Sequence, residues 1–319
     1  MLNVSDYTQV NISAKIGDSN LEDSTYEYIY IYIYMSQTTL FFLFTNTSSL
    51  FNFRNKNIDC AIMPFTGDNS ATLVSMNLQE GDCVVSLGTS DTVLVYLKQG
   101  AAKATTESHL MAHPTDPTGF MGMLCYKNGS LTRQHVRDNY ASSDWDEFNK
   151  LLQTDIQDKT GFYYHMQEII PFAKGIYRFE KGGQQVQEFD NPAANVRAIV
   201  ESQFLSMRVR LQRMTTVESK RILATGGAAA NTALLQVLSN VLGLPVYKQK
   251  GMNSASLGGA LLAKYGVVDH VDNGFKEMME KHATEEPELV CKPDLESTKK
   301  YAVRENEYVR LEKLVVDQQ

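Results

Sequence analysis

The sequence predicts an α/β fold, because helical and strand-like patterns alternate in its second half. A helical pattern over 195–218 is followed by a strand over 221–225, and two glycines then lead into a helix over 231–242. A short strand over 245–248 and a helix over 255–265 complete the series. Alternation of this kind is typical of a layered α/β domain, in which helices cover a sheet.

The first half of the chain supplies further strands. The apolar run 58–64 predicts a buried strand, and Asn69 is a suitable N-cap for a helix that ends near Met76. Two runs rich in apolar and β-branched residues, 82–87 and 92–97, flank a short turn that contains glycine. That arrangement predicts a β-hairpin.

The middle of the chain shows weaker patterns. A strand is expected over 120–126 and a helix over 130–140, whereas residues 141–192 look irregular apart from a short helix over 145–152. The long helix that follows is amphipathic, because apolar residues recur at spacings of three and four. These residues are Val196, Ile199, Val200, Phe204, Met207 and Leu211.

Residues 1–55 differ in character from the rest. Tyrosine and isoleucine alternate over 26–34, the preceding flank is acidic rather than basic as in a signal peptide, and polar residues over 36–39 interrupt the apolar stretch. A membrane span needs about 20 mostly apolar residues. We interpret residues 1–55 as a non-native or disordered segment; a degenerate native segment and a membrane or targeting role are the alternatives.

The remaining chain is expected to form one domain and a tail. Residues 56–275 hold the α/β pattern, and residues 276–319 form a charged tail with a lightly packed surface helix over 301–316. The net charge of −7 and the absence of a dense Lys/Arg run argue against a nucleic-acid surface. Four widely spaced cysteines without a CxxC pair predict neither a zinc site nor a disulfide framework, and favour reduced thiols and a cytoplasmic location.

Asp68 is the first candidate for chemistry. It lies between a predicted strand and a helix start, where α/β sheets bind ligands, and its small neighbours leave space around the carboxylate. Transfer of a phosphoryl group to an alcohol needs such a carboxylate to accept the hydroxyl proton. A capping aspartate in a turn is the structural alternative.

Two turns are candidates for a phosphate or nucleotide site. The hairpin turn formed by Gly88, Thr89 and Ser90 offers backbone N–H groups and hydroxyls that can bind phosphate oxygens. Taken alone, this pattern favours the alternative, an ordinary hairpin turn. Two glycines after the strand over 221–225 allow a flat ligand to approach the backbone. Asn231 either caps the next helix or contacts the ribose or base of a nucleotide.

Trp145, the only tryptophan, lies in a polar segment. It is a candidate wall for stacking an adenine, and an anchor for its loop is the alternative.

Together these segments resemble the C-terminal half of a carbohydrate kinase of the FGGY family. The resemblance covers about residues 59–266 and rests on five segments in the family's order. They are Phe65–Asn69, Gly81–Thr92, Leu124–Leu131, Ile222–Ala228 and Asn253–Ala255.

The resemblance implies a fold, an activity and a set of site residues. The fold is that of an actin-like ATPase, with ribonuclease H-like topology and the active site between two such domains. The implied reaction is ATP-dependent phosphorylation of a sugar, D-xylulose first; a glycerol or gluconate kinase of the same family and a non-catalytic nucleotide-binding domain are the alternatives. Sugar and ATP are the expected small-molecule partners, with Mg²⁺ accompanying ATP, and neither nucleic acid nor membrane is expected.

The family's motifs match individual residues of this chain. Asp68 corresponds to the general base, and Asp68 and Asn69 to sugar-binding residues. The nucleotide-binding positions correspond to Gly88, Thr89, Ser90, Trp145, Gly227, Ala228 and Asn231. Only 67 residues precede Asp68, which we cannot match to the family's first domain, so we expect this chain alone to be weakly active or inactive.

Overall fold

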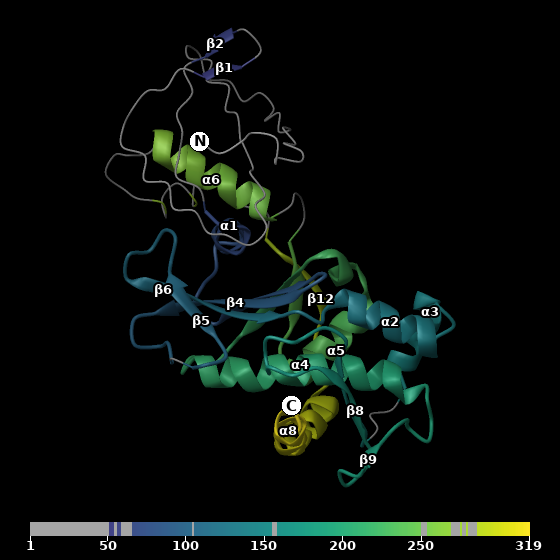
Figure 1. Ribbon diagram of the computed structural model, residues 1–319. Helices are drawn as coiled ribbons and strands as arrows, with labels where there is room; N and C mark the ends of the chain where they lie inside the picture. The colour runs from purple at the N-terminus through teal and green to yellow at the C-terminus, as the bar shows by residue number, and fades with distance from the viewer. Residues whose placement is uncertain are drawn as a thin grey trace.

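A mixed seven-stranded sheet forms the centre of the computed structural model (Figure 1), which describes residues 51–53, 56–58, 66–103, 105–154, 158–249, 254–268, 275, 279 and 286–319. In order across the sheet, the strands are β12 (Glu288–Cys291), β11 (Val246–Lys248), β10 (Arg221–Thr225), β3 (Asp82–Leu87), β4 (Asp91–Lys98), β6 (Gly119–Tyr126) and β5 (His109–Ala112). Most of the predicted atypical N-terminal segment and most of the predicted strand over 58–64 lie outside the described residues.

The directions of the strands place several of their ends at one edge of the sheet. β3 and β11 both run parallel to β10, while β4 is antiparallel to β3 and to β6. β6 therefore has the same direction as β3, β10 and β11. The carboxyl ends of these four strands and the first residue of β4 meet at a single edge, which we call the carboxyl edge.

Helices cover both faces of this sheet. One face packs against α4 (Ala194–Met214), and α5 (Thr232–Leu242) and α8 (Leu295–Val316) join the same core. Two further helices, α2 (Ser130–Tyr140) and α3 (Trp145–Leu152), pack beside α4. The length of α4 and its burial follow from the apolar spacing in its sequence.

The opposite face carries α1 (Asp68–Ser75) and α6 (Ser254–Val268), as Figure 1 shows above the sheet. Leu73 of α1 packs with Val84, Leu94 and other apolar residues on this face. Gly258 of α6 lies against the backbone of Ala71, so closely that a Cβ at this position would clash. The absence of a side chain at Gly258 thus allows α6 and α1 to pack closely.

The helix α1 begins earlier than the sequence predicts. Gly67 precedes it with an extended backbone (φ −71°, ψ 158°), so Asp68 is its first residue and Asn69 is not the N-cap. The carboxylate of Asp68 lies in the first turn, where a negative charge interacts favourably with the helix dipole.

The segment 141–192 is more regular than its sequence indicates. It contains α3 and a second sheet of three antiparallel strands, β7 (Thr160–Tyr164), β8 (Gly175–Phe179) and β9 (Gln185–Val186). Every residue of β7 is buried. The strand therefore lacks the alternation of polar and apolar residues that identifies a half-buried strand.

The last helix is also more deeply buried than expected. α8 begins at Leu295, and Tyr301, Tyr308, Leu311 and Val315 on one of its faces belong to the main core. The expectation of a lightly packed surface helix is therefore wrong.

Two further features complete the description. β1 (Phe51–Phe53) pairs with β2 (Lys56–Ile58) in an antiparallel arrangement. None of the helices among the described residues is long and apolar enough to cross a membrane.

Candidate active site

The candidate site lies along the carboxyl edge, where three chain segments meet. The hairpin turn Gly88–Ser90 joins β3 to β4, the loop Lys127–Gly129 follows β6, and the glycine turn Gly226–Gly227 follows β10. α2 begins directly after the loop, and α5 begins shortly after the glycine turn. Helix N-termini and turn amides both favour anions, so this edge suits a phosphorylated ligand.

The hairpin turn packs against the loop Lys127–Gly129 and is hydrogen-bonded to the residue that follows this loop. The Ser130 N–H donates to the Gly88 carbonyl at 2.8 Å. A Cβ on Gly129 would lie 2.7 Å from the carbonyl oxygens of both Gly88 and Thr89, so only glycine fits there. Thr89 and Ser90 remain exposed, which leaves the tip of the turn accessible to a ligand.

Asp91 anchors the hairpin turn through a buried ion pair. Its two carboxylate oxygens accept from Arg133 of α2 at 2.6 and 3.0 Å, and the side chains are only 1% and 2% exposed. Burial raises the pKa of Asp91, and the Arg133 charge and the Gly88 amide oppose this shift. A bidentate pair in this position fixes the geometry of the turn that precedes it.

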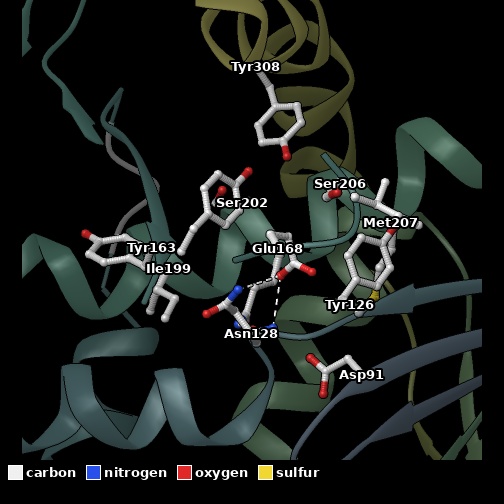
Figure 2. Close-up of a pocket in the computed structure, with 13 residues that line it drawn as sticks. Asp91, Tyr126, Asn128, Tyr163, Glu168, Ile199, Ser202, Ser206, Met207 and Tyr308 are labelled. Carbon is white, nitrogen blue, oxygen red and sulfur yellow. Dashed lines mark hydrogen bonds between the residues drawn. The ribbon is translucent and has the colours of Figure 1, made fainter. Parts of the chain in front are cut away.

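Glu168 holds the neighbouring loop. Its buried carboxylate accepts hydrogen bonds from the backbone N–H groups of Lys127 (2.7 Å) and Asn128 (2.9 Å). The Asn128 side-chain amide donates to the same carboxylate at 2.9 Å, as Figure 2 shows. Glu168 and Asp91 both line a cavity of about 30 Å³, far smaller than the several hundred Å³ of a typical ligand pocket.

The glycine turn packs against the end of β3. Gly226 has φ +85°, and a Cβ at this position would lie 2.6 Å from the Leu87 carbonyl oxygen. Gly227 begins a short 3₁₀ helix, Gly227–Ala230 (η2), and has open space on its Cβ side. Gly227 is exposed and Ala228 is half-buried, so a planar group can approach the backbone here.

Asn231 caps α5, which confirms one of its two expected roles. Its side-chain oxygen accepts from the Leu234 N–H at 3.1 Å, and its side-chain nitrogen donates to Asn149 of α3 at 2.7 Å. An asparagine amide has two N–H groups and two lone pairs. Counting only partners in the described part of the chain, one N–H group and one lone pair of this amide remain for a ligand.

Trp145 lies on the same side of α3 as Asn149. The two residues are four positions apart, which places them on one helix face, and Asn149 contacts Asn231 at the glycine turn. The indole is 41% exposed, packs edge-on against Phe148 at 5.1 Å, and has the Arg137 guanidinium 4.6 Å from its ring centre. Trp145 thus lies one helical turn from the residue that contacts Asn231, and its indole is partly exposed.

Asp68 lies on the opposite face of the sheet from these helices. Its exposed carboxylate accepts from the Asn69 N–H at 2.8 Å, and the Asn69 side chain donates to the sulfur of Met123 in β6 at 3.4 Å. Burial raises the pKa of the Cys125 thiol, and the negative charges of Glu168, Asp68 and Asp91 raise it further. The contact of Asn69 with Met123 places the start of α1 beside β6.

Comparisons with known proteins identify the family. Residues 83–267 match the family model described as "FGGY family of carbohydrate kinases, C-terminal domain", which is more than half of the chain. The chain belongs to the FGGY family of carbohydrate kinases. It is 36% identical over 262 residues to a xylulose kinase of Rattus norvegicus, an alignment that covers 81% of this chain and 48% of the relative.

Solved structures show the same FGGY fold. A xylulose kinase from Rhodospirillum rubrum superposes with a TM-score of 0.62 at 16% identity, over 78% of this chain and 50% of the other. A glycerol kinase from Plasmodium falciparum, solved with ADP, gives 0.60 at 15% identity over 80% and 52%. These similarities confirm the predicted α/β, actin-like ATPase fold. The chain spans about half the length of the curated relatives it matches.

The residues that support the site were less visible in the sequence than those at its surface. Asp91 and Asn128 lie within segments that the FGGY resemblance already uses, but their partners Arg133 and Glu168 do not. Glu168 lies in a segment that looks irregular. A buried glutamate whose partners are backbone N–H groups leaves no sequence pattern, because any residue provides such a donor.

A larger hollow, of about 570 Å³, lies away from the predicted site. It is lined by the segment Ile169–Phe172 and by α8 residues that include Val316. None of the predicted site residues lines it, so it does not enter the proposed function.

Proposed function

We propose that this chain supplies the nucleotide-binding half of an ATP-dependent sugar kinase, and that its sugar is D-xylulose. The observation that carries the proposal is the meeting of the hairpin turn, the loop Lys127–Gly129 and the glycine turn at one edge in an FGGY domain. The 36% identity to the xylulose kinase of Rattus norvegicus favours D-xylulose among the substrates of the family.

In this proposal the nucleotide lies across the carboxyl edge. Gly88, Thr89 and Ser90 bind phosphate oxygens through the accessible tip of the hairpin turn. Gly227, Ala228 and Asn231 bind the adenosine moiety beside Trp145, whose exposed ring is available for stacking. Support comes from the open space at Gly227 and from the Asn149–Asn231 contact that brings α3 to the same place.

Asp68 is proposed as the general base. Its carboxylate takes the proton of the sugar hydroxyl as that oxygen forms a bond to the γ-phosphorus and the bond to the bridging β,γ-oxygen breaks, releasing ADP. The support from the described part of the chain is that Asp68 is exposed and that its side-chain hydrogen bond there is a local one, with the Asn69 N–H. Asn69, one residue further along α1, is proposed to contact the same sugar.

Mg²⁺ fits this site as an ion carried by the nucleotide. The described residues contain no group of three or more His, Cys, Asp or Glu side chains that could hold a metal, and Arg133 already occupies Asp91. Mg²⁺ commonly binds through substrate phosphates, waters and one or two carboxylates. When bound, it neutralises charge on the phosphates that are transferred and released.

A coupled assay with D-xylulose and Mg-ATP tests the proposal. Because this chain alone is expected to be weakly active at most, the expected result is a low sugar-dependent release of ADP that falls by a factor of about 10²–10⁴ in Asp68→Asn, the usual contribution of a general base. Turnover that is unchanged in Asp68→Asn contradicts the assignment of the base. Turnover with glycerol or gluconate but not D-xylulose would move the chain to another branch of the family.

A non-catalytic nucleotide-binding domain is the second candidate. All the predicted nucleotide contacts lie within the matched region 83–267, whereas Asp68 lies outside it, so nucleotide binding can occur without turnover. Isothermal titration calorimetry with Mg-ADP distinguishes the two: binding without any sugar-dependent turnover favours this candidate.

A further inference from the structure

Resting on the proposed function, we propose that Glu168 is a positioning residue for the phosphates of the nucleotide. The Glu168 side chain is buried, so it acts through the loop Lys127–Gly129 rather than on the ligand. Its buried carboxylate fixes the loop Lys127–Gly129, and this loop in turn holds the hairpin turn Gly88–Ser90 in place.

The first step is the bond set of Glu168. The carboxylate is buried, with the residue 3% exposed, and it accepts four hydrogen bonds from N–H donors. Three come from Lys127 and Asn128, and the fourth comes from the backbone of Ile169 at 2.7 Å. An ionised carboxylate accepts at both oxygens, so it satisfies all four donors.

The second step is the contact between the loop and the hairpin turn. Gly129 has no side chain, and its Cα side lies directly against the Gly88 and Thr89 carbonyl oxygens. On the same side of the hairpin turn, the Ser130 N–H donates a hydrogen bond of 2.8 Å to the Gly88 carbonyl. Any shift of the loop therefore moves the backbone of the hairpin turn.

The third step closes the network on its other side. The Gln203 side chain of α4 donates to the Asn128 carbonyl at 2.7 Å and accepts from Arg133 at 2.8 Å. Arg133 continues to Asp91, the first residue after the hairpin turn. The loop and the hairpin turn are thus connected by direct contact and by a buried chain of side chains.

The consequence concerns phosphates rather than adenosine. Backbone amides that bind phosphate act well only when they are held in advance in the correct geometry. The glycine turn has its own support, because Gly226 packs on Leu87 and Asn231 is bound to Asn149. A defect at Glu168 is therefore expected to weaken phosphate binding and to leave the adenosine segment intact.

Calorimetry on the full 319-residue chain with Mg-ADP and with adenosine tests this inference. Glu168→Gln keeps the shape of the side chain but replaces one oxygen with an NH₂ group that faces N–H donors. We expect its affinity for Mg-ADP to fall by a factor of about ten, and its affinity for adenosine to stay within about twofold. Hydrogen exchange of a peptide covering 88–90, measured without ligand, is expected to be faster than in the wild type.

Glu201→Gln is the matched control. Glu201 is a buried carboxylate that accepts from Arg197, Tyr301 and Arg304 and joins α4 to α8 away from the hairpin turn. We expect the Glu201→Gln variant to be destabilised, as Glu168→Gln is. Its ratio of Mg-ADP affinity to adenosine affinity and the hydrogen exchange of the peptide covering 88–90 should both match those of the wild type.

Each other outcome is decisive. Parallel losses of Mg-ADP and adenosine binding in Glu168→Gln, or wild-type behaviour of this variant, overturn the positioning role. If the wild type binds neither ligand, the proposed function fails, and hydrogen exchange then decides separately: faster exchange at 88–90 in Glu168→Gln alone supports the role of Glu168 in ordering the turn, and unchanged exchange overturns it.

Discussion

Gly226 packs directly on the backbone of Leu87, with no room for a side chain between them. A Cβ on Gly226 would lie 2.6 Å from the Leu87 carbonyl oxygen, and the residue has φ +85°, a conformation that L-residues rarely adopt. This contact joins the ends of β10 and β3. It therefore sets the spacing between the two turns that we assign to adenosine and phosphate.

Gly226→Ala is expected to destabilise the protein by about 2–4 kcal/mol, because the positive φ and the overpacking each cost roughly 1–2 kcal/mol. Gly227→Ala is the matched control one residue later. Open space surrounds its Cβ position, so its free energy of unfolding should change by less than about 0.5 kcal/mol. Urea denaturation measures both, and equal losses would contradict the packing argument.

Arg133→Met is expected to cost about 3–5 kcal/mol, because it leaves the buried Asp91 carboxylate without its partner. Replacing both residues, Asp91→Leu with Arg133→Met, should recover most of that loss, since no unpaired charge then remains. Chemical denaturation of the two single variants and the double variant gives the coupling energy. Additive losses would show that the pair does not act as a unit.

Glu312→Ala is expected to destabilise the protein by about 3 kcal/mol, because Arg210 of α4 is almost fully buried and loses its bidentate partner on α8. Glu107 still contacts Arg210, which places the loss at the low end of the range for a broken buried pair. Glu296→Ala is the control on the same helix, where the pair with Lys299 is exposed. Its effect should stay within about 0.5 kcal/mol in thermal denaturation.

Stability is expected to fall as the pH drops below about 6.5, the usual pKa of an unfolded histidine. Burial lowers the pKa of His165 in the folded protein, and the nearby His135 and Arg178 lower it further. Between the folded and unfolded pKa values the unfolded chain binds a proton that the folded chain does not, so lowering the pH favours unfolding. The titration of His165 can lower the free energy of unfolding by at most about 1.4 kcal/mol per pH unit.

His165→Phe tests the source of this pH dependence. The phenyl ring keeps an aromatic contact with His135, whose ring centre lies 4.3 Å away, but it cannot titrate. Denaturation midpoints at several pH values between about 5 and 7 should show a flatter profile for the variant than for the wild type. An identical profile would place the titrating group elsewhere.

Much of the fold and the surface of the candidate site could be predicted from local patterns. The hairpin of β3 and β4, the strand β10 with its glycine turn, and the helices α4 and α5 lie close to their predicted positions. Apolar spacing and glycine placement are properties of neighbouring residues, so the sequence shows them directly. The strand β7 was not predicted, because all its residues are buried and its sequence therefore lacks the alternation of polar and apolar residues.

The sequence by itself determined the α/β class, the FGGY motifs and the turns that carry Gly88 and Gly227. Only the tertiary structure decided what holds those turns: Arg133 binds Asp91 across 42 residues, Glu168 binds the Asn128 backbone across 40, and Asn149 binds Asn231 across 82. The physical reason is that the backbone conformation of a turn requires glycine at particular positions, so the turn can be recognised from its own residues. Its supporting hydrogen bonds depend instead on which distant side chains the packing of α2, α3 and the sheet brings within about 3 Å.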